Sequence, residues 1–155
     1  MSSKTERLIE EYQALPNSED RYELVHNRIS DIKSPADALA LCRTIGFRES
    51  FPDENTKQIQ LEVAKKALEI GFNDRKTLIE LHKMVYDPST AELRKAVLIP
   101  LDKQLIKLTD FKNPVQLRSF CDAWKVELTF TKVTDAIQFN ARQTLFQYLV
   151  EVCNQ

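Results

Sequence analysis

The sequence predicts an all-α protein of stacked antiparallel helix pairs, and three observations lead to this fold class. Glycine occurs only twice in 155 residues, far below the usual frequency of about 7%. Because tight β-hairpins depend on glycine, this scarcity disfavours a fold rich in β-sheet. Apolar residues recur at helical spacing along almost the whole chain. Two segments, residues 31–45 and 110–124, also resemble each other in sequence.

The two similar segments read DIKSPADALALCRTI and DFKNPVQLRSFCDAW, and they lie 79 residues apart. A third, more divergent copy begins near Asn73, so the expected helix caps Ser34, Asn73 and Asn113 are spaced by 39 and 40 residues. A period near 40 residues is typical of helical repeat arrays. Four aligned positions are identical in the first and last copies: Asp31 and Asp110, Lys33 and Lys112, Pro35 and Pro114, and Cys42 and Cys121.

The first three predicted helices have clear boundaries. The first covers residues 4–15 and the second covers 19–33, each with apolar residues along one face. Ser34 is a favourable N-cap for the third helix, and Pro35 suits its first position. Gly46 ends this helix because glycine adopts the left-handed conformation at low cost.

Three further helices are predicted in the middle of the chain. One covers residues 53–70, and the next is capped by Asn73 and ends before Pro88. A long helix over residues 90–108 contains Pro100, which removes a backbone hydrogen bond from the helix interior. We therefore expect a kink at Pro100 or two shorter helices.

The last part of the chain predicts two more helices. Asn113 and Pro114 begin the seventh, which carries Trp124 on its inner face. Residues 125–130 alternate between polar and apolar types, but a lone strand would have no pairing partner. We therefore predict an extended connection there, followed by an eighth helix over residues 132–152.

These elements form one predicted domain over residues 1–155, in which residues 1–17 are an N-terminal capping helix and residues 18–155 are helix-pair repeats. Short connections between helices force neighbours to be antiparallel. Over about residues 19–152 the architecture resembles the HEAT and armadillo class of helical repeats. The resemblance implies a short solenoid with a binding surface along one face; a compact all-α domain of about eight helices is the alternative. The polar outer face of the first helix favours a monomer.

Composition narrows the classes of function. The net charge is −1, which gives no general attraction to nucleic acid or to a membrane surface. No stretch approaches the roughly 18 apolar residues of a membrane span, and the start of the chain does not resemble a signal peptide. The three cysteines have no metal-binding spacing, so we expect reduced thiols, no metal and no cofactor. A cytoplasmic location is predicted, with the nucleus as an alternative.

Motifs of catalysis are not recognisable in the sequence. His26 and His82 belong to no metal-binding motif, and we interpret His82 as a residue at a helix surface or boundary. Cys42 and Cys121 occupy matched apolar positions, which favours packing over reactivity. We therefore do not predict an enzyme; a cluster joining His82 to carboxylates within a pocket would change that prediction.

Basic residues on the shorter helices are the candidate binding site. If these helices line the binding face of the array, their cations form a loose basic track, although a solvated surface is the simpler interpretation. The predicted function is a non-catalytic protein–protein interaction or adaptor module that presents a helical groove to a protein or peptide, with an acidic partner favoured. Nucleic-acid binding through the same track is the alternative. The candidate partner-binding residues are Arg75, Lys76, Lys83, Arg118 and Lys125.

Overall fold

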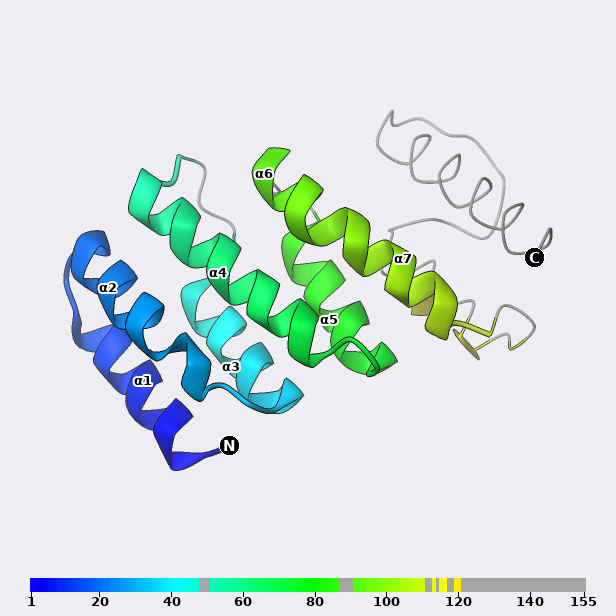
Figure 1. Ribbon diagram of the computed structural model, residues 1–155, viewed down its shortest axis with the longest axis horizontal. Coiled ribbons are helices and arrows are strands. Elements are labelled where there is room, and N and C mark those ends of the chain that lie inside the picture. The colour runs from blue at the N-terminus through cyan, green and yellow to red at the C-terminus, as the bar shows by residue number, and fades with distance from the viewer. Residues whose placement is uncertain (48–50, 87–90, 111–112, 114, 117–118, 121–155) are drawn as a thin grey trace.

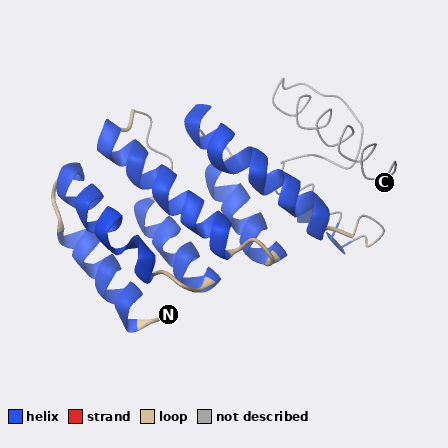
Figure 2. Ribbon diagram, viewed as in Figure 1, coloured by secondary structure: helices blue, strands red, loops and turns tan. Residues whose placement is uncertain are grey.

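The computed structural model describes residues 1–47, 51–86, 91–110, 113, 115–116 and 119–120. This described part is helical and contains no β-strand (Figure 2). None of its helices is long and apolar enough to cross a membrane. The elements are α1 (Ser3–Ala14), α2 (Ser18–Arg28), the 3-10 turn η1 (Ile29–Asp31), α3 (Pro35–Ile45), α4 (Glu54–Ile70), α5 (Arg75–Val85), α6 (Ala91–Leu93), the π-helical η2 (Arg94–Leu98) and α7 (Ile99–Leu108).

The all-helical prediction is confirmed, but fewer helices are described than were predicted. With α6, η2 and α7 counted as one α6–α7 helix, the described chain contains six helices up to Leu108. The second predicted helix is shorter than expected, because α2 ends at Arg28 and continues only as η1. The predicted connection over residues 125–130 and the predicted eighth helix lie outside the described residues.

The helices are arranged in two layers (Figure 1). One layer contains α1, α3 and α5, and the other contains α2, α4 and the α6–α7 helix. Within the layers, α3 packs against both α1 and α5, while α4 packs against both α2 and η2. Across the layers, α1 contacts α2, α3 contacts α4, and α5 contacts α7. Within each of these three pairs, the second helix runs in the opposite direction to the first (Figure 1).

The beginnings of the helices are set by capping side chains. At the start of each of α1 to α5, a side-chain oxygen accepts a hydrogen bond from the backbone N–H three residues further on. This bond satisfies one of the N–H groups that a helix leaves unpaired at its start. The five capping residues are Ser2, Asn17, Ser34, Asp53 and Asp74.

The predicted cap Ser34 is confirmed, whereas the predicted cap Asn73 is wrong. The cap of α5 is Asp74, whose Oδ2 lies 2.7 Å from the Thr77 hydroxyl and whose Oδ1 accepts from the Thr77 N–H at 3.3 Å. Two hydrogen bonds from Thr77 favour the carboxylate at position 74 over the amide at position 73. The middle copy of the similar segments therefore starts one residue later than the sequence alone indicated.

With these caps aligned, α3 and α5 bury the same positions. The third, fourth, fifth, seventh and eighth residues after the cap are buried in both helices. His82 consequently occupies in α5 the place that Cys42 occupies in α3. The two sets are Asp37, Ala38, Leu39, Leu41 and Cys42 in α3, and Thr77, Leu78, Ile79, Leu81 and His82 in α5.

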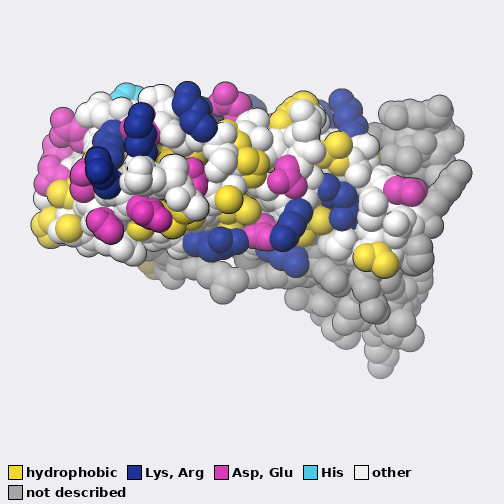
Figure 3. Space-filling view, turned by 90° about the horizontal axis from the view of Figure 1, so that it is seen from below, with side chains coloured by type: hydrophobic (Ala, Val, Ile, Leu, Met, Phe, Trp, Pro, Cys, Tyr) yellow, Lys and Arg dark blue, Asp and Glu magenta, His cyan; other side chains and the backbone are white. Residues whose placement is uncertain are grey.

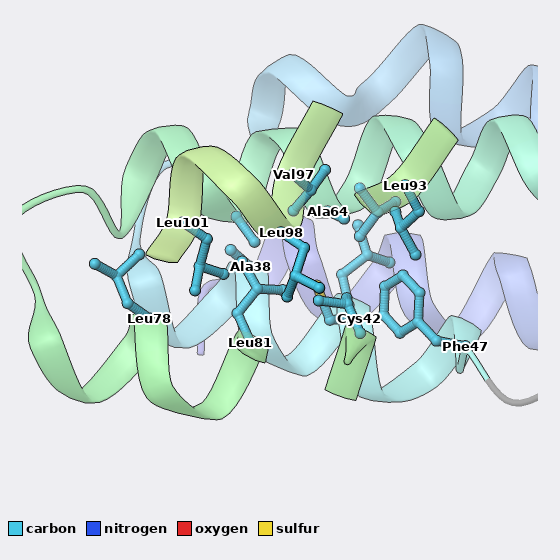
Figure 4. Packing of buried hydrophobic residues seen from close by; sticks show 14 of the residues in the cluster. Ala38, Cys42, Phe47, Ala64, Leu78, Leu81, Leu93, Val97, Leu98 and Leu101 are labelled. Carbon is cyan, nitrogen blue, oxygen red and sulfur yellow. The ribbon is translucent and has the colours of Figure 1, made fainter. Parts of the chain in front are cut away.

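One hydrophobic cluster connects the layers from Leu8 in α1 to Phe120 after α7. In Figure 4 the labelled side chains of α3, α4, α5 and the α6–α7 helix converge on this cluster. Cys42 lies inside it with no exposed surface, and burial raises the pKa of its thiol to about 12. The prediction that Cys42 serves packing is confirmed; Cys121 and Trp124 lie outside the described residues.

Where a kink or a break into two helices was expected at Pro100, the structure shows a change of helix type just before it. Residues Arg94–Leu98 are π-helical, and a regular α-helix resumes at Ile99 with Pro100 near its start. Pro100 has no N–H to donate to the carbonyl of Ala96, and its ring would clash with that carbonyl in a regular α-helix. The π-helical segment lets the chain pass the proline while the buried row of Leu93, Val97 and Leu101 is retained.

The two glycines end helices for different reasons. Gly46 has a φ of 68° and a ψ of 161°; the positive φ favours glycine, although the ψ differs from that of the left-handed helical conformation that was predicted. Gly71 has a φ of −83°, so it needs no special backbone freedom. A Cβ atom at position 71 would instead lie 2.7 Å from Cγ2 of Thr77. Close approach of α5 therefore explains Gly71, and the next residue, Phe72, is 46% exposed.

Asp37 links the beginnings of α1 and α3 and supplies a testable pH dependence. Its Oδ1 accepts from the Ser2 N–H at 3.2 Å, and only 5% of its surface is exposed. Burial alone would raise the pKa of Asp37, but hydrogen bonds from Ser2, Thr5 and Ser34 together hold that pKa below its ordinary value. Because the pKa is depressed in the fold, the stabilisation is present above the unfolded pKa and is lost as pH falls through the folded pKa.

We expect Asp37→Asn to lower the free energy of unfolding by about 1 to 2 kcal/mol at neutral pH, since hydrogen bonds to a buried carboxylate are lost. The loss should shrink as the pH falls below the ordinary pKa of aspartate. Urea unfolding across pH measures both effects. Asp20→Asn is the matched control, because Asp20 is also the third residue of its helix but is exposed. Equal effects of the two substitutions would contradict this account.

Candidate interaction groove

A hollow between α3 and α5 is the candidate functional site. It has a volume of about 430 Å³ and lies towards the C-terminal ends of both helices. Cys42 and Phe47 are buried and Met84 is half-buried, so its floor is apolar, while Arg43 and Lys83 are exposed at its rim. We call this hollow the α3–α5 groove, lined by Cys42, Arg43, Gly46, Phe47, Lys83 and Met84.

Local helix geometry explains why two cations stand at this rim. Arg43 and Lys83 are each the ninth residue after their N-cap, one position beyond the buried Cys42 and His82. That position turns the side chain out of the core and beside the neighbouring helix. Both cations also lie in the last turn of a helix, where positive charge is favoured by the helix dipole. Arg43 and Lys83 therefore also stabilise the helices in which they lie.

The two cations differ in their partners. Arg43 of α3 forms an ion pair with Glu80 of α5, with Nη2 and Oε2 2.5 Å apart. Lys83 forms no ion pair with any residue that the structure describes. Glu80 is the sixth residue after its cap, and the sixth residue after Asn113 is Ser119. A carboxylate matching Glu80 is thus missing for Lys83 in the following segment.

Ser119 has a different role, because it binds Arg75. The Arg75 guanidinium donates to the Thr109 hydroxyl at 3.2 Å, to the Gln116 carbonyl at 2.6 Å and to the Ser119 hydroxyl at 3.0 Å. The side chain is half-buried, and burial lowers its pKa. Arg75 therefore ties the start of α5 to the segment after α7, which sequence reasoning did not anticipate.

The other predicted site residues do not gather at the groove. Lys76 is exposed near the start of α5 and does not line the groove, whereas Lys83 does. Arg118 and Lys125 lie outside the described residues. The described part of the predicted basic track is thus not continuous. Arg75 is hydrogen-bonded to the segment after α7, Lys76 is exposed, and only Lys83 lines the groove.

The apolar part of the groove was not predicted as a site. Phe47, which follows the end of α3, is buried in the core at 5% exposure. Met84 was not singled out, since one half-buried methionine has no distinctive pattern. Aligning α3 with α5 on their N-caps would have shown that Met84 and Lys83 match residues near the end of α3. That alignment is correct only when Asp74, and not Asn73, is taken as the N-cap of α5. By contrast, Phe51 is 95% exposed.

The prediction that His82 lies at a helix surface or boundary is wrong. His82 is fully buried beside a carboxylate. Its Nε2 lies 3.0 Å from Oδ1 of Asp102 in α7, and its ring stacks on Tyr86 at a centroid distance of 5.1 Å. Burial raises the pKa of Asp102, and the contact with His82 opposes only part of that effect. His82 and Asp102 are 0% and 2% exposed, so the pair faces neither solvent nor the groove. Its position fits packing of α5 on α7.

A second hollow lies between α2 and α4, with a volume of about 350 Å³. Its lining includes His26, Glu62, Lys65, Lys66 and Glu69, and Nδ1 of His26 lies 2.8 Å from Oε1 of Glu62. Two lysines and two glutamates in one shallow hollow balance each other. It therefore has no charge preference comparable with that of the α3–α5 groove.

The surface charge is mixed. Figure 3 shows a face on which Lys and Arg side chains are interspersed with Asp and Glu.

In the described part of the chain, no group of three or more His, Cys, Asp or Glu side chains could hold a metal ion. No family model matches this chain, and no curated protein or solved structure matches it either.

Proposed function

We propose that this protein is a protein-interaction module without catalytic function, a short HEAT-like array of helix pairs that binds an acidic protein or peptide segment. The observation that carries the proposal is the α3–α5 groove, in which Lys83 has no ion pair among the described residues beside an apolar floor. An apolar side chain of the partner would enter between Phe47 and Met84. A carboxylate next to it would reach Lys83.

Physical considerations support this combination of contacts. Burial of an apolar anchor supplies affinity, because a few well-packed residues dominate most interfaces. A cation at the rim contributes mainly orientation, association rate and discrimination against basic partners. The groove offers both features in six residues that lie at the C-terminal ends of α3 and α5 or just after α3.

We expect Lys83→Glu to weaken partner binding roughly tenfold, because attraction to a carboxylate becomes repulsion. Wild-type and variant proteins are used for affinity capture from a native lysate, with and without nuclease, and the captured partner is then titrated against each. Lys76→Glu is the matched control, since it makes the same charge change on the exposed start of the same helix. Both variants should remain folded; Lys83→Glu should lower the unfolding midpoint slightly, because it places a negative charge in the last turn of α5, whereas Lys76→Glu near the start of α5 should not lower it.

The alternative function, nucleic-acid binding through a basic track, predicts a different outcome. Both charge reversals would then weaken binding, captured proteins would vanish after nuclease treatment, and affinity would fall steeply with salt. The interspersed charges of the face in Figure 3 give this alternative less support, since a nucleic-acid site generally requires an excess of Lys and Arg on one face. A nuclease-resistant partner that binds Lys83→Glu as well as wild type would exclude the groove.

A further inference from the structure

The ion pair between Arg43 and Glu80 stands beside the groove and spans its two helices. Arg43 comes from α3 and lines the groove, while Glu80 comes from α5. The side chains are 59% and 31% exposed, so the pair is accessible to a molecule seated in the groove. An exposed pair of this kind holds weakly and can exchange partners.

The two rim cations, Arg43 and Lys83, differ in the residue that the next segment places at the equivalent position. Arg43 and Lys83 share the ninth position after the cap, but only Arg43 has a carboxylate at the sixth position of the next short helix. The next segment has Ser119 there, and its hydroxyl accepts from Arg75. Among the described residues, therefore, no carboxylate competes for Lys83, whereas Arg43 must first release Glu80.

We propose that Glu80 is a built-in competitor for the acidic partner of the groove. This inference rests on the proposed function and adds how the site is regulated. Glu80 holds Arg43 in the free protein, and a carboxylate of the partner replaces it after the segment has been oriented by Lys83. The partner is thus an amphipathic segment with an apolar residue flanked by at least two acidic ones. A singly charged segment would engage Lys83 alone and bind more weakly.

The first consequence concerns Glu80→Gln, which keeps the size of the side chain and removes its charge. We expect this variant to bind an acidic amphipathic peptide about two- to fivefold more tightly at low salt, the range that an exposed ion pair supports. The gain should vanish in an Arg43→Gln background, because Glu80 then has no cation to withhold. It should also diminish at high salt, where exposed charges are screened.

The experiment uses the full chain and a phage-displayed library of random peptides as the probe. A selected peptide is synthesised and titrated by fluorescence polarisation against the wild type and against Glu80→Gln, Arg43→Gln, their double variant and Lys83→Gln. Glu10→Gln on α1 is the control for net charge, because Glu10 is exposed on a helix that does not line the groove. Thermal unfolding confirms that each variant is folded.

Three outcomes are informative. A gain for Glu80→Gln that exceeds that of Glu10→Gln and is absent without Arg43 supports the competitor. Equal effects of Glu80→Gln and Glu10→Gln, with a loss for Lys83→Gln, overturn the competitor but leave the proposed groove standing. Selected peptides without acidic residues, or binding that Lys83→Gln does not change, overturn the groove and the competitor together.

Discussion

Phe120→Ala is expected to lower the free energy of unfolding by about 3 to 5 kcal/mol, the usual cost of removing a buried aromatic ring. Phe120 has no exposed surface and belongs to the same hydrophobic cluster as the residues of α1 to α7. It is the seventh residue after Asn113, the position of Leu41 in α3 and of Leu81 in α5. The segment after α7 is therefore expected to unfold together with the preceding helices.

Urea unfolding followed by circular dichroism measures this effect. Val115→Ala is the control, because Val115 lies five residues earlier and is 76% exposed; it should change stability by less than about 0.5 kcal/mol. A loss below about 1 kcal/mol for Phe120→Ala would show that this segment does not contribute to the cooperative core. A separate early transition would show that it unfolds on its own.

The buried pair of His82 and Asp102 is expected to give the second largest effect. His82→Leu alone should cost about 3 kcal/mol, because a buried carboxyl group loses the imidazole 3.0 Å away. Asp102→Ala alone should cost about 1 to 3 kcal/mol, because a buried imidazole nitrogen loses its partner. The double variant should cost less than the sum, with a coupling of about 1 to 3 kcal/mol.

The preceding helix pair, α3 and α4, explains why the double variant should cost less than the sum of the single variants. Buried positions recur with the same spacing in α4 and α7, and they place Ala64 where α7 has Asp102. Cys42 likewise stands where α5 has His82. One helix pair thus packs without polar groups at the positions where the next contains both. Strictly additive losses in the double-mutant cycle would show that the two side chains do not interact.

The same pair gives a pH dependence opposite to that of Asp37. Burial raises the pKa of Asp102 in the fold, so the folded state binds more protons than the unfolded state between the ordinary and the raised value. Stability from this group therefore falls as the pH rises through that window. Asp102→Ala should remove this fall, whereas Asp37→Asn should remove the loss of stability in acid.

The helices that pattern alone predicted well are those whose signals are local. The bounds of α1, α3 and α4 lie within one residue of expectation, because their caps and apolar rows act within a few turns. Asn73 and Asp74 could not be separated in this way, since both are good caps and the choice depends on Thr77. That one-residue difference also concealed the equivalence of His82 and Cys42.

The candidate site depended on contacts that no local pattern contains. Arg75, Lys76 and Lys83 looked alike as outward cations of one helix. Packing gave Arg75 three acceptors from beyond α7, left Lys76 exposed and placed Lys83 at the same groove as Phe47, which follows α3. Each of these roles is decided by residues tens of positions away in the chain.

The amino-acid sequence by itself determined that this protein is helical, where most of its described helices begin and which faces are apolar. These properties follow from hydrogen bonds and side-chain spacing within a few residues. Only the tertiary structure decided which polar side chains are buried together, as His82 is with Asp102, and which cation of α5 lines a groove. Burial and ion pairing depend on neighbours brought together by the packing of two helix layers, which short-range rules do not specify.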